Sequence, residues 1–378
     1  MTGHALDIYE GKTVLVTGSS GFKGSWLSIW LVELGAKVVG YSLGPPTEPS
    51  MFDATDLTNK YVNIIGDVRD EKHLLSTFEA HQPDFVFHLA AQPIVRRSYK
   101  EPRLTYETNV MGTVNLLEAV RKTESARVVI VVTSDKCYQN KESIYGCREI
   151  DPMGGDDPYS SSKGCAELVV SAYRASFFDC KNGSKKVALA SVRAGNVVGG
   201  GDWGQDRLVP DCIRALSGGN EIVIRNPASV RPWQYVLEPL GGYLLLGTKM
   251  LENIEKYADA WNFGPSENDA ISVEEIVKKI IVYWGNGQYK LESAPNEPHE
   301  ARSLRLDCSK ARTMIGWEPA YTINEALMET VTWYTKFYEK RVTGDLYDYT
   351  VKQIMKYMAK SGFHADFLKA SHGTSNSS

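Results

Sequence analysis

A tyrosine and a lysine four residues apart, Tyr159 and Lys163, are the sequence's first candidates for proton-transfer chemistry. Residues spaced i and i+4 lie on one face of a helix, so the two side chains would be neighbours. A cation beside a phenol lowers the phenol pKa from about 10, so that Tyr159 could act as a base toward a hydroxyl group. The spacing alone is weak evidence, because 20 tyrosines and 42 basic residues give roughly two such pairs by chance, and an ordinary exposed helix pair is the alternative.

Three consecutive residues, Ser134, Asp135 and Lys136, follow the predicted strand 128–132 and form a second candidate group. Asp135 could donate a proton if it were protonated, and Lys136 could accept one if it were neutral. Free Asp has a pKa of about 3.9 and free Lys of about 10.4, so a protonated Asp135 and a neutral Lys136 both require burial. The second cation, Lys163, would further lower the pKa of Lys136. The alternative is a charged ion pair that only positions water or substrate.

A glycine-rich turn, Thr17 to Gly24, lies between the first predicted strand and the helix predicted at 22–34. Gly18, Gly21 and Gly24 would let the backbone approach a pyrophosphate whose charge faces the helix N-terminus. Such a glycine triplet occurs roughly 0.2 times by chance in a chain of this composition, so its position after a strand carries the argument. The alternative is a plain glycine-rich turn.

The second predicted strand, 36–40, leads into Tyr41 and Ser42 without an acidic residue that could bind the adenosine ribose of NAD. No arginine is present for the 2′-phosphate of NADP either, although Lys23 is close in sequence. The sequence therefore predicts a dinucleotide, taken as NAD, without excluding NADP. Asp67, after the third strand, could bind the adenine amino group or could instead cap a helix.

The elements that must position these residues alternate between short apolar runs and helical patterns, which is typical of a parallel sheet buried on both faces. Strands are predicted at 13–17, 36–40, 62–65, 85–87, 128–132 and 187–192, and helices at 22–34, 99–122, 156–179, 272–284 and 324–340. In the 99–122 helix, one face carries Val110, Val114, Leu117 and Val120. The predicted fold class is α/β, a Rossmann-type doubly wound parallel sheet with a smaller, mostly C-terminal α/β domain that binds substrate.

The predicted boundaries are a dinucleotide-binding domain at 1–193, to which some later segments return, a substrate domain at 194–360 and a disordered tail at 361–378. The 378 residues are 43% hydrophobic with a net charge of −4, which suits a packed core and argues against partners such as nucleic acid or a membrane surface. The chain shows no apolar span and no signal peptide, so a cytoplasmic location is expected. The six cysteines are scattered, and neither disulfides nor a metal site is predicted.

The ordered set of glycine turn, Thr133-Ser134-Asp135 and Tyr159/Lys163 resembles the extended short-chain dehydrogenase/reductase family of nucleotide-sugar epimerases and dehydratases, over about residues 10–340. His88-Leu89-Ala90-Ala91 and Asn109 match as well. In dTDP-glucose 4,6-dehydratases a Thr-Asp-Glu triplet stands where this chain has Ser134-Asp135-Lys136. Together with the motifs 193–203 and Arg231-Pro232-Trp233-Gln234, this departure makes the chain most similar to the CDP-glucose 4,6-dehydratases.

The resemblance implies a redox-neutral elimination of water. Tyr159 would take the C4 hydroxyl proton with help from Ser134 and Lys163, Lys136 would remove the C5 proton, and Asp135 would protonate the departing C6 hydroxyl. The implied cofactor-binding residues are Gly18, Gly21, Phe22, Lys23, Gly24, Asp67, Val68, Leu89, Ala90, Ala91, Asn109, Thr133, Tyr159 and Lys163. The candidate substrate-binding residues are Asn196, Arg207, Arg231, Trp233, Tyr235 and Arg302, although Arg207 and Arg302 could equally be surface arginines.

The implied substrate is CDP-glucose or a similar nucleotide sugar, in deoxysugar biosynthesis of the O-antigen or polysaccharide kind. A homodimer, or a dimer of dimers, is expected through the 99–122 and 156–179 helices. Three alternatives stay open at this point: a 4-epimerase or decarboxylase, against which Asp135 and Lys136 argue; a dehydratase of dTDP- or GDP-sugars; and a non-catalytic dinucleotide sensor.

Overall fold

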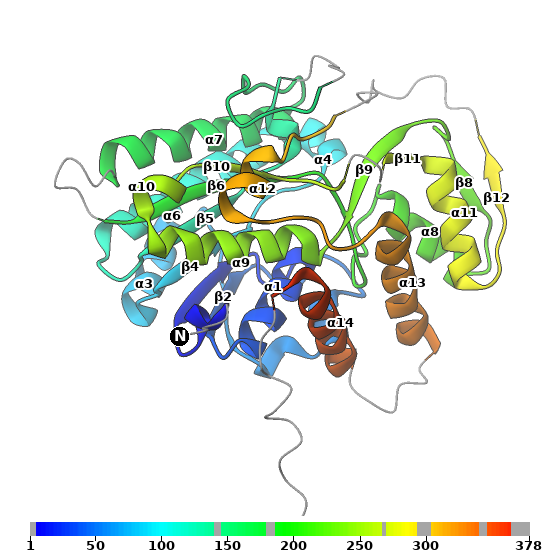
Figure 1. Ribbon diagram of the computed structural model, residues 1–378, viewed down its shortest axis with the longest axis horizontal. Helices are drawn as coiled ribbons and strands as arrows, with labels where there is room; N and C mark the ends of the chain where they lie inside the picture. The colour runs from blue at the N-terminus through cyan, green and yellow to red at the C-terminus, as the bar shows by residue number, and fades with distance from the viewer. Residues whose placement is uncertain are drawn as a thin grey trace, which may run out of the picture.

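The computed structural model describes residues 5–139, 145–178, 186–266, 270–292, 304–339 and 346–363. Its centre is a seven-stranded parallel sheet in the order β10-β6-β5-β4-β1-β2-β3 (Figure 1). The strands are β1 (Thr13–Thr17), β2 (Lys37–Ser42), β3 (Val62–Ile65), β4 (Phe85–His88), β5 (Val128–Val132), β6 (Ala188–Ala194) and β10 (Ala260–Phe263). The strand order reverses between β1 and β4, and this doubly wound arrangement confirms the predicted fold class.

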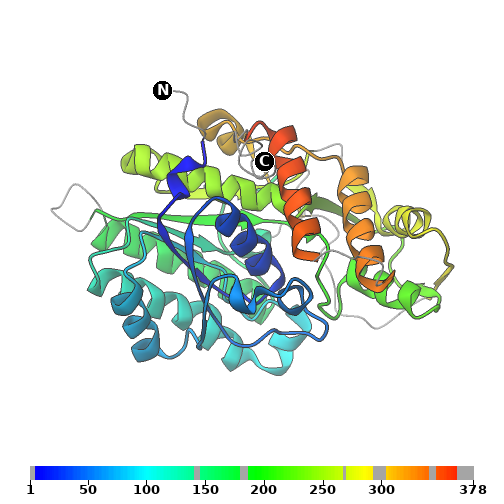
Figure 2. The ribbon, with the colours of Figure 1, turned by 90° about the horizontal axis from the view of Figure 1, so that it is seen from below.

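Helices cover both faces of this sheet (Figure 2). Val14 and Val16 of β1 pack in the core that includes the helices at 22–33 and 237–252, whereas Leu15 packs on the opposite side with the helices at 71–81, 112–122 and 158–177. Because successive strand residues point to opposite faces, a continuous apolar run is needed where both faces are covered. The helices are α1 (Phe22–Glu33), α3 (Glu71–His81), α6 (Gly112–Lys122), α7 (Pro158–Phe177) and α9 (Leu237–Glu252).

The helix predicted at 99–122 is not continuous. The structure has α4 (Val95–Lys100), α5 (Pro102–Tyr106), a π-helical turn η3 (Glu107–Met111) and then α6. Pro102 lacks a backbone N–H and fits the first turn of a helix, which explains why α4 ends before it and α5 begins with it. Leu117 and Val120 are fully buried, but Val110 in η3 and Val114 in the first turn of α6 are only half-buried, so the predicted face is correct only for the later part of α6.

The second half of the chain builds two small sheets and also returns to the large one. β7 (Asn196–Val198), β9 (Val230–Tyr235) and β11 (Ala270–Ser272) form one small sheet, and β8 (Ile222–Ile224) pairs with β12 (Tyr289–Leu291). Helices α8 (Leu208–Ser217), α11 (Val273–Trp284) and α13 (Ile323–Glu339) pack around them. β10 and α9 belong to the large sheet and its cover, and α12 (Ser309–Ile315) packs beside them. The domain limits at 193 and 360 themselves stay a prediction.

The C-terminal helix α14 (Leu346–Ser361) packs on α1 and α13. Beyond it Phe363 is buried, with its ring centroid 6.4 Å from that of Trp30 and 6.3 Å from that of Tyr357. The disordered tail predicted from 361 therefore starts too early, because an aromatic side chain anchors the chain there. Residues 364–378 of that prediction lie outside the described residues.

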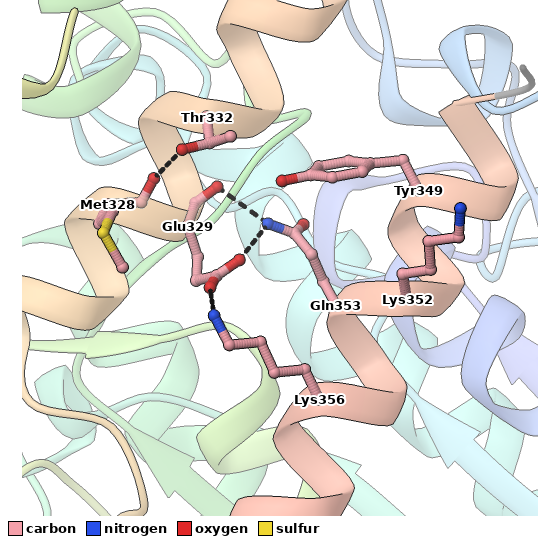
Figure 3. A pocket seen from close by; sticks show the side chains of 7 residues that line it. All are labelled: Met328, Glu329, Thr332, Tyr349, Lys352, Gln353 and Lys356. Atoms are coloured by element: carbon pink, nitrogen blue, oxygen red, sulfur yellow. Dashed lines mark hydrogen bonds and ion pairs between the residues drawn. The ribbon is translucent and has the colours of Figure 1, made fainter. Parts of the chain in front are cut away.

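A pocket of about 300 Å³ lies between α13 and α14 (Figure 3). At its centre Glu329 accepts a hydrogen bond from Gln353 Nε2 at 2.8 Å and forms an ion pair with Lys356. This group links the two helices. None of the predicted site residues lines the pocket.

Candidate active site

The glycine-rich turn has the shape that a pyrophosphate requires. Gly18 has φ +72°, and a Cβ atom there would lie 2.8 Å from the backbone nitrogen of Ala90. A Cβ on Gly24 would lie 2.0 Å from the Gly18 carbonyl oxygen, so neither position admits a side chain. Gly21 is the N-cap residue of α1 and supplies no side-chain cap. The start of α1 is thus a bare backbone cradle that suits a bound phosphate, and the residues fit a dinucleotide.

The loop after β4 is tied to this turn at the point where the strand order reverses. The Leu89 N–H donates to the Thr17 carbonyl at 3.1 Å, and the Ala90 N–H donates to Thr17 Oγ1 at 3.2 Å. Thr17 Oγ1 also hydrogen-bonds His88 Nδ1 at 2.7 Å. Burial lowers the pKa of His88 to about 3, so the imidazole is neutral. The loop 89–91 therefore lies where this fold class binds dinucleotides.

The end of β2 is closed by serines. Ser42 Oγ accepts from the Ser20 N–H at 3.3 Å and lies 3.2 Å from Ser19 Oγ. Lys23 is not there: its Nζ donates to the Tyr243 hydroxyl at 3.2 Å. Burial and the charges of neighbouring cations, Lys163 foremost, lower the pKa of Lys23 to about 7. The structure therefore gives no support to Lys23 as a ligand for a 2′-phosphate.

Asp67 and Val68 lie after β3, as predicted, but Asp67 caps no helix. Its carboxylate accepts from the Arg69 backbone N–H at 2.9 Å and from the Arg69 guanidinium, which lowers the pKa of Asp67. The side chain of Asp70 caps α3 instead. Val68 is buried against Gly112, where a Cβ atom would lie 2.7 Å from Val68 Cγ2.

Tyr159 and Lys163 lie on one face of α7, whose N-terminus is capped by Asp157 accepting from the Ser160 N–H at 2.9 Å. Both side chains are buried, and Lys163 Nζ donates to the Val132 carbonyl at 3.3 Å. Burial lowers the pKa of Lys163 to about 8. Burial also raises the pKa of Tyr159 to about 12, outweighing a hydrogen bond with Ser134 that lowers it. The expected lowering of the phenol pKa is therefore not achieved by the protein groups alone.

The loop after β5 forms the 3-10 turn η4 (Asp135–Cys137), with Ser134 as its N-cap. Ser134 Oγ accepts from the Lys136 N–H at 3.2 Å and donates to Asp135 Oδ1 at 2.9 Å. Asp135 is buried, which raises its pKa, while the charge of Lys136 acts in the opposite direction. Lys136 is half-buried. The direction of the Asp135 shift is the one that an acid needs.

The charges of two arginines from the second half of the chain act on these residues. Arg231 of β9 acts on Asp135, whose pKa its charge lowers. Arg207 is the N-cap residue of α8, donates to Asp202 at 2.8 Å, and its charge lowers the pKa of Tyr159. The Arg207 side chain is 35% exposed, so both interpretations of it, as a substrate-binding residue and as a surface arginine, stay predictions. Asn196 begins β7, which pairs in parallel with β9.

Other predicted residues take different positions. Tyr235 is fully buried, with its ring stacked on Tyr321 at 5.4 Å, so it is a core residue rather than a pocket lining. Among the described residues, no partner is found for the buried Nε1 of Trp233. Asn109 is buried in η3, where its amide donates to the Gln92 carbonyl and to Ser162 Oγ at 2.8 Å. It joins two elements of the site instead of facing an open space. Arg302 lies outside the described residues.

Sequence reasoning missed a buried ion pair behind the site. Glu167 and Arg193 are each 4% exposed, and their Oε2 and Nη2 atoms are 2.7 Å apart. One signal was available, because Glu167 continues the four-residue spacing of Tyr159 and Lys163 along α7. Thr133 donates from its hydroxyl to Glu167, so it faces this pair.

Two features are absent from the described residues. No group of three or more His, Cys, Asp or Glu side chains there could hold a metal ion. In the same residues, no helix combines the length and the apolar character that crossing a membrane requires.

Comparison with known proteins gives consistent results. Residues 15–330 match the family described as GDP-mannose 4,6 dehydratase. The chain is 51% identical over 329 residues to the CDP-glucose 4,6-dehydratase of Salmonella typhimurium, covering 87% of this chain and 92% of that protein. It is 27% identical to the dTDP-glucose 4,6-dehydratase of Xanthomonas campestris pv. campestris, covering 85% and 93%. The solved structure of Thermotoga maritima UDP-glucose 4-epimerase with UDP-glucose superposes with a TM-score of 0.71 at 25% identity, covering 86% and 99%.

Proposed function

Because the chain belongs to the GDP-mannose 4,6 dehydratase family and is an NAD-dependent nucleotide-sugar 4,6-dehydratase, we propose that its substrate is CDP-glucose. The product would be CDP-4-keto-6-deoxyglucose, formed by loss of water. The observation that carries the proposal is the loop 134–136, in which Ser134 and Asp135 are buried and Lys136 is half-buried. Ser134 hydrogen-bonds Tyr159 of α7, and the charge of Arg231 of β9 lowers the pKa of Asp135. The identity of 51% to a CDP-glucose 4,6-dehydratase supports the choice of nucleotide.

Bound NAD supplies a hydride acceptor for C4 of the sugar and a hydride donor for C6. The bare backbone of Gly18 to Gly24 and the N-terminus of α1 would hold its pyrophosphate. The 89–91 loop and Val68 would line the remainder of the site, and Lys163 would orient the nicotinamide ribose. The Arg69 guanidinium neutralises Asp67, so Asp67 is a weaker candidate for the adenine amino group than its position suggested.

For the oxidation of C4, Tyr159 would accept the hydroxyl proton as hydride departs. The raised pKa of Tyr159 favours the protonated phenol, so the reaction needs positive charge close to it. The charge of Arg207 already lowers this pKa, Lys163 lies one helical turn further along α7, and Ser134 can share its hydrogen bond with the substrate hydroxyl. The base is therefore a group of residues around Tyr159 rather than a pair.

For the elimination, Lys136 would remove the proton from C5, which the neighbouring 4-keto group acidifies. Asp135 would give its proton to the C6 hydroxyl as it leaves as water, and its burial supports the protonated form. Arg231 and Asn196 would bind the diphosphate, since a guanidinium fork matches phosphate oxygens.

The proposal includes a homodimer, or a dimer of dimers, built through the α4–α6 segment and α7. These helices expose large apolar side chains, among them Met111 at 50% and Leu168 at 61% exposure. Exposed apolar surface of this kind is typical of a protein interface. The proposed pathway is deoxysugar biosynthesis.

The proposal is tested by incubating the protein and NAD with CDP-glucose, dTDP-glucose, GDP-mannose or UDP-glucose. The expected result is a 4-keto-6-deoxy product from CDP-glucose, detected by its absorbance in alkali and by the mass lost as water. Product from dTDP-glucose alone would contradict the assignment of the nucleotide. Formation of the C4 epimer from UDP-glucose, without loss of water, would identify an epimerase instead.

A further inference from the structure

The buried carboxylate of Glu167 joins α7 to the ends of two strands. It accepts hydrogen bonds from the hydroxyl of Thr133, from Ser191 Oγ at 2.6 Å, and from Arg193 Nε and Nη2 at 2.9 Å and 2.7 Å. The arginine contact is a two-pronged pair in which both oxygens are used. The Glu167 carboxylate thereby holds Thr133, the first residue of the loop 133–138 that carries Asp135 and Lys136.

The other end of the same loop is held by the remaining arm of Arg193. Its Nη1 donates to the hydroxyl of Tyr138, and its guanidinium lies 4.7 Å from the centre of that ring. The Tyr138 hydroxyl in turn donates to Asn262 Oδ1 of β10 at 2.8 Å. Tyr138 is the C-cap residue of η4, so Asp135 and Lys136 lie between two anchored residues.

Stability alone gives a weak reason for this arrangement. A buried ion pair must offset the cost of removing two charges from water, and well-packed apolar residues often stabilise a protein as much. Fixed geometry gives a stronger reason, because proton transfer requires donor and acceptor within about 2.6–3.2 Å. Six residues, Thr133 to Tyr138, are too short to fix their own conformation through a regular helix.

We propose that Glu167, Arg193 and Tyr138 are positioning residues for the elimination step, holding the loop that carries Asp135 and Lys136. They act through the loop and do not touch the substrate. The oxidation step depends on them less, because Ser134 is its one residue in the loop, whereas Tyr159 and Lys163 are fixed by α7 and by the bond of Lys163 to the Val132 carbonyl. This inference rests on the proposed function, since it concerns the reaction with CDP-glucose.

The test is Tyr138→Phe, which keeps the ring and removes only the hydroxyl. The expected result is a fall of about tenfold in kcat with KM for CDP-glucose unchanged, because displacements of the order of 1 Å reduce rates by up to about a hundredfold. The fraction of reduced cofactor in the steady state should rise, since oxidation continues while elimination slows. Near-ultraviolet absorbance of the reduced nicotinamide measures this fraction during turnover.

The matched control is Tyr9→Phe, which also removes a fully buried hydroxyl. The Tyr9 hydroxyl donates to the Leu244 carbonyl at 2.8 Å, and neither residue belongs to the site. It should lower the melting temperature as Tyr138→Phe does, with unchanged kcat and unchanged cofactor reduction. The proposal is overturned if Tyr138→Phe keeps its kcat, or if its kcat falls without a rise in reduced cofactor. Absence of product from the wild-type protein would instead contradict the proposed function and, with it, the inference that rests on it.

Discussion

α7 and the loop 133–138 meet at the catalytic end of the sheet but hold their side chains in different ways. Tyr159 and Lys163 belong to a 20-residue helix that is capped by Asp157 and buried along one face. The loop has the short turn η4 and two backbone hydrogen bonds to its surroundings, from the Thr133 N–H to the Val192 carbonyl at 2.9 Å and from the Gly154 N–H to the Cys137 carbonyl at 2.8 Å. Side-chain bonds of Thr133, Ser134 and Tyr138 add to these. The residues of the oxidation step therefore lie mainly on one helix, with Ser134 contributed by the loop, whereas the residues of the elimination step lie on a loop in which side-chain bonds add to a few backbone bonds.

The comparison predicts that the two halves can be separated by mutation. Lys136→Met should reduce product formation by about 10³-fold, because general base catalysis contributes on this scale. Cofactor binding and reduction by CDP-glucose should remain, since α7 is untouched. Stopped-flow absorbance of the reduced nicotinamide, followed by product analysis, measures both steps.

The control for this variant is Lys356→Met, the same substitution on α14. Near-normal turnover of Lys136→Met would rule out Lys136 as the base. If Lys136→Met lost cofactor reduction as well as product formation, the oxidation and elimination steps could not be separated by this substitution.

A smaller effect is expected in the pH dependence of cofactor reduction, the step that depends on Tyr159 and Lys163 of α7. Burial lowers the pKa of Lys163 to about 8, so the cation is present below that pH and is lost as the pH rises through it. Cofactor reduction should therefore decline on the alkaline side. In Lys163→Arg the positive charge persists to high pH, so the decline in cofactor reduction should shift to higher pH even if the rate at neutral pH falls. An unchanged alkaline limb in the variant would assign it to another group.

The smallest effect of a substitution is expected at the α13–α14 contact (Figure 3). Its ion pair between Glu329 and Lys356 serves as a reference for the buried pair of Glu167 and Arg193. Lys356 is 60% exposed, and Glu329 keeps its bond from Gln353 when Lys356 is removed. Lys356→Met should change the free energy of unfolding by at most about 1 kcal/mol and leave kcat unaltered. Urea denaturation measures the first quantity. A loss of several kcal/mol would mean that exposure is a poor guide to the value of an ion pair in this protein.

Much of the fold could be predicted from sequence because its strands are continuous apolar runs. β1, β3 and β5 have the predicted limits, and β4 is one residue longer than predicted. The continuous helix predicted at 99–122 was wrong, because the spacing of the apolar residues favours one helix whereas Pro102 ends α4 and begins α5. A pattern of apolar residues does not report where a π-helical turn interrupts a helix, because packing decides it.

The candidate site was predictable only where motif and position coincide. The glycine turn and α7 lie as expected, but a strand aromatic such as Tyr235 can face a pocket or a core, and sequence cannot decide between them. The pKa of Tyr159 depends on burial, which appears only when the chain is folded. Glu167 and Arg193 are 26 residues apart, and the sheet brings them together.

In the proposed reaction, hydride leaves C4 and returns to C6 within one active site, and water is eliminated between the two transfers. The most direct measurement uses CDP-glucose carrying deuterium at C4, with the product analysed by mass spectrometry and NMR. The proposed reaction places the deuterium at C6 of a product that has lost water. Deuterium retained at C4, or released to the solvent, would contradict it.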